Sequence, residues 1–352
     1  MKAAVLYAQN DIRVEEMAVP ALEPHEILVK IKATGICGSD LPRVLGDAAH
    51  HYPIVLGHEF AGIVERIGSG VSRVKAGDRV AGVPLKPCFK CGDCLSGGYA
   101  QCRHYSFIGS RVNGSWAEYV AIPEINAIRF DDAVSFEEAA FVEPSAVALH
   151  ALQHIRFQGG WHTAVLGGGN IGLLALQWAK ILGAREVTVF DIDDDRLESA
   201  RRLGADHTIN AAHPDMEERW KRITDGKGFP VVLETAGSEV TMRQSFELAA
   251  NKAKVCFIGT SAKDITFAHK QFELMNRKEF TLTGSWMSYS APFPGREWEL
   301  TLHFLKQGRL NFKDLIDRRF PLEEINAAFD LYRMPGGVKG KLMLLPDDLR
   351  IR

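Results

Sequence analysis

Two patterns of hydrophobic and polar positions follow one another along the chain. Up to about residue 145, short apolar and β-branched runs at Ala3–Tyr7, Glu26–Ala33 and Gly62–Ile67 are separated by glycine and proline. This pattern predicts β-strands joined by turns. From about residue 160, short apolar runs alternate with segments whose apolar residues recur at helical spacing. That alternation predicts a doubly wound parallel sheet of the α/β class.

The second half predicts six strands separated by helices of about ten residues, and the tail is mixed. We expect the tail to pack back on the first domain. The predicted strands are Thr163–Leu166, Val187–Phe190, His207–Asn210, Val231–Glu234, Lys254–Ile258 and Phe280–Thr283. The first predicted helix has its apolar repeat from Ile171 to Leu182 and is ended by Gly183. The others are Asp195–Leu203, Met216–Ile223, Val240–Ala250 and Phe272–Arg277. In the tail we expect a helix at Trp298–Gln307 and a strand at Lys341–Leu345.

Composition narrows the classes of function. The chain has 42 basic and 44 acidic residues and a net charge of −2, which gives no general attraction to nucleic acid or anionic membrane. An anionic substrate must therefore meet a local basic group. We find no apolar run long enough for a membrane span, and the apolar start is too short for a secretion signal. These features predict a cytoplasmic protein.

Four of the six cysteines lie close together in one segment. In an unexported chain of this size, such clustering indicates a metal site more than disulfides. Four thiolates at this spacing close a tetrahedral zinc shell and leave no open position, which is typical of structural zinc. An iron–sulfur cluster, whose run usually carries its fourth cysteine elsewhere, and a loop without metal are the alternatives. The four residues are Cys88, Cys91, Cys94 and Cys102.

A glycine-rich segment follows the first strand of the second half. Its glycines allow a tight turn, close approach of a pyrophosphate and close packing of the helix. The acidic residue Asp191 stands at the end of the next strand. This context favours a dinucleotide site over an ordinary strand-to-helix turn. Asp191 should bind the ribose hydroxyls and repel a 2′-phosphate, which favours NAD over NADP. Arg196 is a further candidate contact and the argument for NADP. The segment contributes Gly167, Gly169, Asn170, Ile171 and Gly172.

Two dispersed residues are candidates for a catalytic metal. Cys37 lies in Gly35-Ile-Cys-Gly-Ser-Asp40, and His58 precedes Glu59. A catalytic zinc needs three protein ligands and one open position, and one cysteine and one histidine from separate loops suit that requirement. For an isolated histidine, a buried structural role is the alternative.

Taken together, these motifs resemble the zinc-containing medium-chain dehydrogenase family over essentially the whole chain. The resemblance implies a GroES-like catalytic domain over 1–145 with a zinc lobe at 88–102. A Rossmann domain over 146–288 follows, and 289–352 returns to the catalytic domain. It implies two zinc ions per chain and a homodimer or homotetramer. It also implies that Cys37, His58 and Glu143 bind the catalytic zinc, with Glu59 nearby and Ser39 as the proton-relay hydroxyl. Pro42 stands where alcohol dehydrogenases have the next relay histidine.

A glutamate as third zinc ligand resembles the polyol dehydrogenase branch of the family. Other segments, among them Leu41–Arg43 and Phe107–Arg111, resemble members that act on a sugar-alcohol phosphate. We therefore predict NAD-dependent oxidation of such a phosphate to the keto-sugar phosphate. The alternatives are an unphosphorylated polyol such as sorbitol, threonine, or a non-catalytic nucleotide-binding protein on the same scaffold. The candidate substrate residues are Arg43 and Arg111 for the phosphate, and Tyr52 and Trp286 for the pocket wall.

Overall fold

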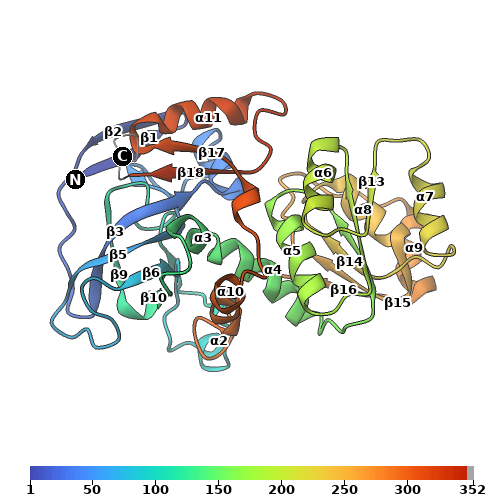
Figure 1. The fold of residues 1–352 in the computed structure, drawn as a ribbon, viewed down its shortest axis with the longest axis horizontal. Coiled ribbons are helices and arrows are strands. Elements are labelled where there is room, and N and C mark those ends of the chain that lie inside the picture. The colour runs from blue at the N-terminus through green and yellow to red at the C-terminus, as the bar shows by residue number, and fades with distance from the viewer. Residues whose placement is uncertain (347–352) are drawn as a thin grey trace. The chain divides into compact units, whose positions relative to one another are not determined.

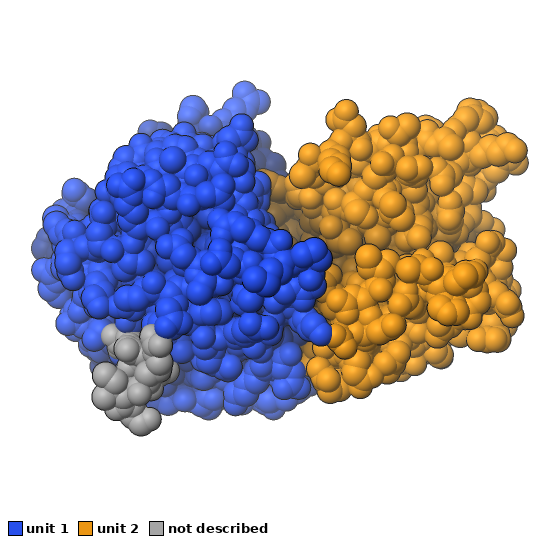
Figure 2. All heavy atoms as spheres, turned by 90° about the horizontal axis from the view of Figure 1, so that it is seen from above, with its two compact units in different colours: residues 1–143, 289–352 blue, residues 144–288 orange. Residues whose placement is uncertain are grey.

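The computed structural model describes residues 1–346, and its chain divides into two compact units (Figures 1 and 2). Unit 1 combines residues 1–143 with the chain from residue 289 onward, and unit 2 comprises Pro144–Ser288. Within the described residues, no helix is both long and apolar enough to cross a membrane.

Unit 1 is built on β-sheets. Its largest sheet has the strand order β10-β6-β5-β3-β18-β17, with β9 also paired to β3, and a smaller sheet has the order β2-β1-β4. The strand β18 runs antiparallel to β3, so this part of the tail packs against the first part of the chain. The strands are β1 (Lys2–Ala8), β2 (Asp11–Glu16), β3 (Glu26–Gly35), β4 (Ile54–Val55), β5 (Glu59–Ile67), β6 (Arg79–Gly82), β7 (Leu85–Lys86), β8 (Ser106–Phe107), β9 (Tyr119–Pro123), β10 (Ala127–Arg129), β17 (Ile316–Pro321) and β18 (Lys341–Leu345).

Short helices complete unit 1. They are α1 (Leu41–Val44), α2 (Gly92–Leu95), α3 (Phe136–Ala140), α10 (Arg296–Lys306) and α11 (Ile325–Arg333). A further helix, α4 (Val142–His154), begins in unit 1 and continues the chain into unit 2.

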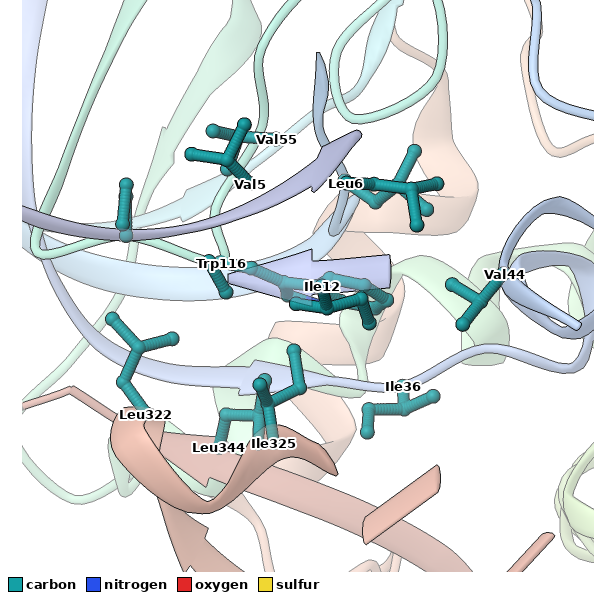
Figure 3. Close-up of a cluster of buried hydrophobic side chains, with 14 of the residues drawn as sticks. Val5, Leu6, Ile12, Ile36, Val44, Val55, Trp116, Leu322, Ile325 and Leu344 are labelled. Carbon is teal, nitrogen blue, oxygen red and sulfur yellow. The ribbon is translucent and has the colours of Figure 1, made fainter. Parts of the chain in front are cut away.

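A cluster of buried apolar side chains joins the first strands to the returning tail (Figure 3). Leu6 of β1 and Ile12 of β2 lie in the same cluster as Trp116, Ile325 and Leu344. Burying one large apolar side chain stabilises a fold by roughly 1.5–3 kcal/mol. The cluster therefore holds the tail strand β18 against the sheet that carries the candidate metal ligands.

Unit 2 contains the predicted parallel sheet. Its six strands have the order β13-β12-β11-β14-β15-β16. The first three strands are added toward one edge of the sheet and the last three toward the other, so the order switches between β11 and β14. Its elements are β11 (His162–Leu166), α5 (Asn170–Ile181), β12 (Glu186–Asp191), α6 (Asp194–Arg202), β13 (His207–Asn210), α7 (Met216–Ile223), β14 (Phe229–Glu234), α8 (Glu239–Leu248), β15 (Ala249–Phe257), α9 (His269–Lys278) and β16 (Thr281–Gly284).

The predicted boundary between α8 and β15 was wrong. The helix expected to reach Ala250 ends at Leu248, and β15 begins at once with Ala249. The Lys278 ammonium donates to the backbone carbonyls of Glu247 and Ala249, both at 2.7 Å. A distant side chain therefore caps the last turn of α8, which no local sequence signal could show.

Candidate active site and cofactor site

Strand register brings the dispersed metal-ligand candidates together in unit 1. Gly35 at the end of β3 pairs with Glu59 at the start of β5, so the loops carrying Cys37 and His58 leave the sheet side by side. Met343 of β18 also pairs with Gly35, which places the start of β18 at the same edge. The sheet thus gathers residues that lie far apart in the sequence.

Cys37, His58 and Glu59 form a potential metal-binding group. One ligand atom of each lies within 4.8 Å of the others, and the histidine and glutamate are buried. Thiolate, imidazole and carboxylate are the usual ligands of zinc, so these residues fit that ion.

Asp40 orders the cysteine loop and faces the histidine. Its carboxylate accepts a hydrogen bond from the backbone N–H of Cys37 at 3.0 Å, and its Oδ1 lies 3.5 Å from His58 Nδ1. Burial by itself would lower the pKa of His58, but Asp40 and Cys37 raise that pKa well above its usual value. A carboxylate beside the second ring nitrogen is the arrangement that orients metal-binding histidines.

Lys341 is a member of the site that sequence reasoning missed. Its Nζ atom lies 2.7 and 2.5 Å from the two carboxylate oxygens of Glu59, and both side chains are at most 4% exposed. Burial would lower the pKa of Lys341, yet Glu59 and Cys37 raise it above the ordinary lysine value. The sequence offers one signal for this residue, a lysine at the first position of the apolar run Lys341–Leu345. That pattern predicts only the start of a strand.

Glu143 lies in the first turn of α4 and is buried. It is outside the 4.8 Å group formed by Cys37, His58 and Glu59. Burial is the main reason that its pKa is raised to about 7, while the charge of His58 lowers it and that of Glu59 raises it. Glu143 is therefore close enough to His58 and Glu59 for their charges to act on its pKa.

A group of basic side chains adjoins the metal-ligand candidates. Arg43 on α1 donates to the backbone carbonyl of Ser39, and its Nη1 lies 3.7 Å from Asp40 Oδ1. Burial and then the charges of Arg111, Arg43 and His51 lower the pKa of His50, and His51 Nε2 lies 3.2 Å from the backbone carbonyl oxygen of Arg111. We call Arg43, His50, His51 and Arg111 the basic cluster. His50 and His51 lie in a segment, Ala49–Pro53, that resembles the same family members, but neither was among the predicted site residues.

The other predicted residues of the substrate pocket occupy different surroundings. Ser39 is exposed in the turn Gly38–Asp40. Tyr52 is also exposed, and it follows His51 of the basic cluster directly in the sequence. The Arg111 guanidinium stacks on Tyr105 at 4.4 Å from the ring centre. Trp286 is half exposed and belongs to unit 2.

The four clustered cysteines of unit 1 have the geometry of a metal shell. Their sulfur atoms all lie within 4.8 Å of one another, and Cys88 Sγ is 3.9 Å from Cys94 Sγ. Four sulfurs around zinc, each at about 2.3 Å, lie about 3.8 Å apart. All four are free thiols, and interactions with backbone N–H groups lower the pKa of Cys88 to about 6. The cluster therefore fits a structural zinc.

In unit 2 the glycine-rich loop joins β11 to α5. A Cβ at Gly172 would run into the carbonyl of Gly167, so the start of α5 requires glycine there. A Cβ at Gly169 would meet no atom within 4 Å, so packing within the chain does not explain that glycine. Asn170 begins the helix, and its buried Oδ1 lacks a partner among the described residues. Ile171 follows in the first turn.

Asp191 closes the same loop from the end of β12. Its Oδ2 accepts a hydrogen bond from the backbone N–H of Gly168 at 2.6 Å, and its Oδ1 accepts one from Asp193 at 2.9 Å. Arg196 Nη1 lies 3.7 Å from Asp191 Oδ2. A glycine loop, a helix N-terminus and an acidic residue thus meet at the carboxyl edge of the sheet, where the strand order reverses and nucleotides bind.

Fold and site together define a zinc-type dehydrogenase. Residues 170–306 match the family model for zinc-binding dehydrogenases, and residues 23–132 match that for the GroES-like domain of alcohol dehydrogenases. The chain belongs to the zinc-binding dehydrogenase family and is an oxidoreductase.

Two relatives narrow the comparison. The chain is 39% identical over 348 residues to galactitol 1-phosphate 5-dehydrogenase of Escherichia coli K12, covering 98% of this chain and 100% of the relative. The crystal structure of the E. coli galactitol-1-phosphate dehydrogenase superposes with a TM-score of 0.94 and the same coverage. Sorbitol dehydrogenase of Bacillus subtilis is 32% identical, covering 94% of this chain and 93% of that enzyme.

A second relative of known structure was crystallised with a nucleotide. It is described as a candidate zinc-binding dehydrogenase from Sinorhizobium meliloti 1021 bound to NADP, with 29% identity and a TM-score of 0.88. The alignment covers 98% of this chain and 99% of the relative.

Proposed function

We propose that this enzyme oxidises a sugar-alcohol phosphate, galactitol 1-phosphate, to tagatose 6-phosphate with NAD⁺. The observation that carries the proposal is the position of Asp40, which lies 3.5 Å from His58 Nδ1 and 3.7 Å from Arg43 Nη1. One buried carboxylate thus links the metal-ligand group to the basic cluster. A hydroxyl held at the metal and a phosphate held at the basic cluster can therefore belong to one small molecule.

We assign Cys37, His58 and Glu143 as ligands of a catalytic zinc, which when bound supplies Lewis-acid polarisation of the substrate oxygen. Lys341 engages both oxygens of Glu59, which supports keeping Glu59 as a charged neighbour rather than a permanent ligand. The four cysteines of the lobe hold a second, structural zinc. The chain then carries two zinc ions.

Ser39 is assigned as the group that receives the hydroxyl proton. It lies two residues after Cys37, and it is exposed, so its Oγ can pass the proton to water. Pro42 on α1 carries no titratable group, so the chain offers no second relay side chain at that position. NAD⁺ held by the glycine loop and Asp191 would supply the hydride acceptor for the carbon that bears this hydroxyl, which becomes the ketone carbon.

The phosphate contact falls to the basic cluster. Arg43 and Arg111 supply planar guanidinium groups, whose paired N–H donors match phosphate oxygens. The Nε atom of Arg43 is buried and lacks a hydrogen-bond partner among the described residues. His50 and His51 add donors at the rim. Tyr52 is assigned to the pocket wall.

We assign NAD as the cofactor, held by the glycine loop and Asp191. A 2′-phosphate would meet the carboxylate of Asp191, which Arg196 at 3.7 Å offsets only in part. The NADP-bound relative shows that its own site accepts the phosphorylated cofactor. In this chain the three acidic residues that follow in sequence, Asp193, Asp194 and Asp195, add to the negative charge at the end of β12.

Assembly and location complete the proposal. β16 is an edge strand of the six-stranded sheet and exposes Leu282, which supports a homodimer or a homotetramer of paired sheets. All six cysteines are free thiols, which suits the reducing cytoplasm.

Initial rates of NADH formation test the proposal. The substrates are galactitol 1-phosphate, galactitol, sorbitol and threonine, each also measured with NADP⁺ and after chelation. We expect rates confined to the phosphorylated polyol with NAD⁺, lost on chelation and restored by zinc. Equal rates with galactitol would remove the phosphate assignment. No rate with any substrate at full zinc content would refute the proposed reaction.

A further inference from the structure

Two histidines and a glutamate meet at the amino edge of the parallel sheet in unit 2. His162 begins β11, Glu186 begins β12 and His207 begins β13. In the parallel register His162 pairs with Glu186, and His207 pairs with Thr188. Because alternate residues of a strand point to the same face, all these side chains project from one face of three adjacent strands.

Their distances are those of a ligand set. Glu186 Oε2 lies 3.2 Å from His162 Nδ1 and 4.0 Å from His207 Nε2. A ligand atom of each residue lies within 4.8 Å of the others. Nitrogen and oxygen ligands placed about 2.1 Å from a tetrahedral ion lie about 3.4 Å apart. The ion therefore needs only a small movement of the exposed histidine.

The surroundings also suit metal binding. His162 is 2% exposed, and its Nε2 is 2.8 Å from Thr188 Oγ1, which leaves Nδ1 facing the glutamate. The Phe229 ring packs edge-on against His162 at 4.8 Å and fixes its orientation. Burial is the main reason that the pKa of His162 is lowered to about 4, so its ring is neutral at neutral pH, the form that binds metals.

We propose that His162, Glu186 and His207 bind a divalent transition-metal ion of the zinc type, at a site separate from the two zinc sites of unit 1. Two imidazoles and one carboxylate are a common zinc ligand set. Glu186 and His207 are each 37% exposed, so the ion can enter from solvent and keep water in the fourth position. The site lies at the edge opposite the carboxyl ends that form the cofactor loop. Bound metal would tie β11, β12 and β13 together.

The test uses the full-length, zinc-replete enzyme and compares single variants. Zinc bound per chain is measured by mass spectrometry after equilibrium dialysis against micromolar Zn²⁺. We expect the wild type to bind one more zinc than His207→Gln and Glu186→Gln. Losing one ligand should weaken binding by at least about tenfold. The matched control is His213→Gln, another exposed histidine of unit 2 beside a carboxylate, Asp215 at 2.8 Å, which should bind as the wild type does.

Thermal unfolding gives a second readout. Added zinc should raise the melting temperature of the wild type and of His213→Gln, and leave that of His207→Gln unchanged. Equal zinc content in the wild type and His207→Gln would overturn the proposal. His162 and Glu186 would then be an ordinary polar pair, with His207 next to them and no metal between the three. The difference between variants does not depend on how many zinc ions unit 1 holds.

Discussion

Removing the Lys341 ammonium should destabilise unit 1, because it leaves the buried carboxylate of Glu59 without its partner. In Lys341→Met the carboxylate of Glu59 loses the ammonium that lies 2.7 and 2.5 Å from its oxygens. Glu59 stays buried in a site that also contains Glu143 and Asp40. Breaking a buried ion pair by removing one partner costs about 3–5 kcal/mol, because the remaining charge is left unpaired.

Hydrogen exchange of the β3 and β5 amides measures this loss where the pair is held. In saturating zinc, Lys341→Met should lower their opening free energy by about 3 kcal/mol or more. The matched control is Lys306→Met, which removes an exposed ion pair of unit 1 at 2.7 Å and should cost at most about 1 kcal/mol. Adding Glu59→Gln to Lys341→Met should recover part of the loss. Equal losses in the two single variants would refute the reasoning.

Three further predictions concern other parts of the molecule. Asp191→Asn keeps an acceptor for the Gly168 N–H but removes the charge, so the preference for NAD⁺ over NADP⁺ in kcat/KM should fall about tenfold; an unchanged preference would exclude Asp191 as its source. Cys94→Ser should lose one zinc per chain by mass spectrometry and lower the melting temperature, because its sulfur completes the lobe; full zinc content would contradict this. The pKa of His162 is lowered to about 4 from 6.5, so the unfolded chain takes up a proton first on acidification. Stability should therefore fall by up to about 3 kcal/mol between pH 6.5 and 4, a slope that His162→Gln should reduce in urea titrations.

Features encoded by local spacing could be predicted from the sequence. The four cysteines of the lobe are close in the chain, so their spacing alone indicated a metal shell. The glycine loop and Asp191 lie in one strand–helix–strand unit, and that unit fixes their contact. The six strands of unit 2 followed from their apolar runs.

Features that depend on register could not be predicted in this way. Glu59 and Lys341 are 282 positions apart and meet only because β5 and β18 both pair with β3. The contact of His162 with Glu186 needs the register of β11 against β12. The strand β17 and the helix α11 were not identified in the tail. The strand β17 has few apolar positions, and the helix α11 packs against the first strands through long-range contacts.

The hydride itself provides the most direct test of the proposed reaction. Galactitol 1-phosphate carrying deuterium at C5 is incubated with the zinc-replete enzyme and NAD⁺, and the reduced cofactor is analysed by mass spectrometry. If the enzyme transfers the hydride from C5 to NAD⁺, we expect NADH that carries one deuterium atom, formed together with tagatose 6-phosphate. Unlabelled NADH, or no NADH from a fully zinc-loaded enzyme, would contradict it.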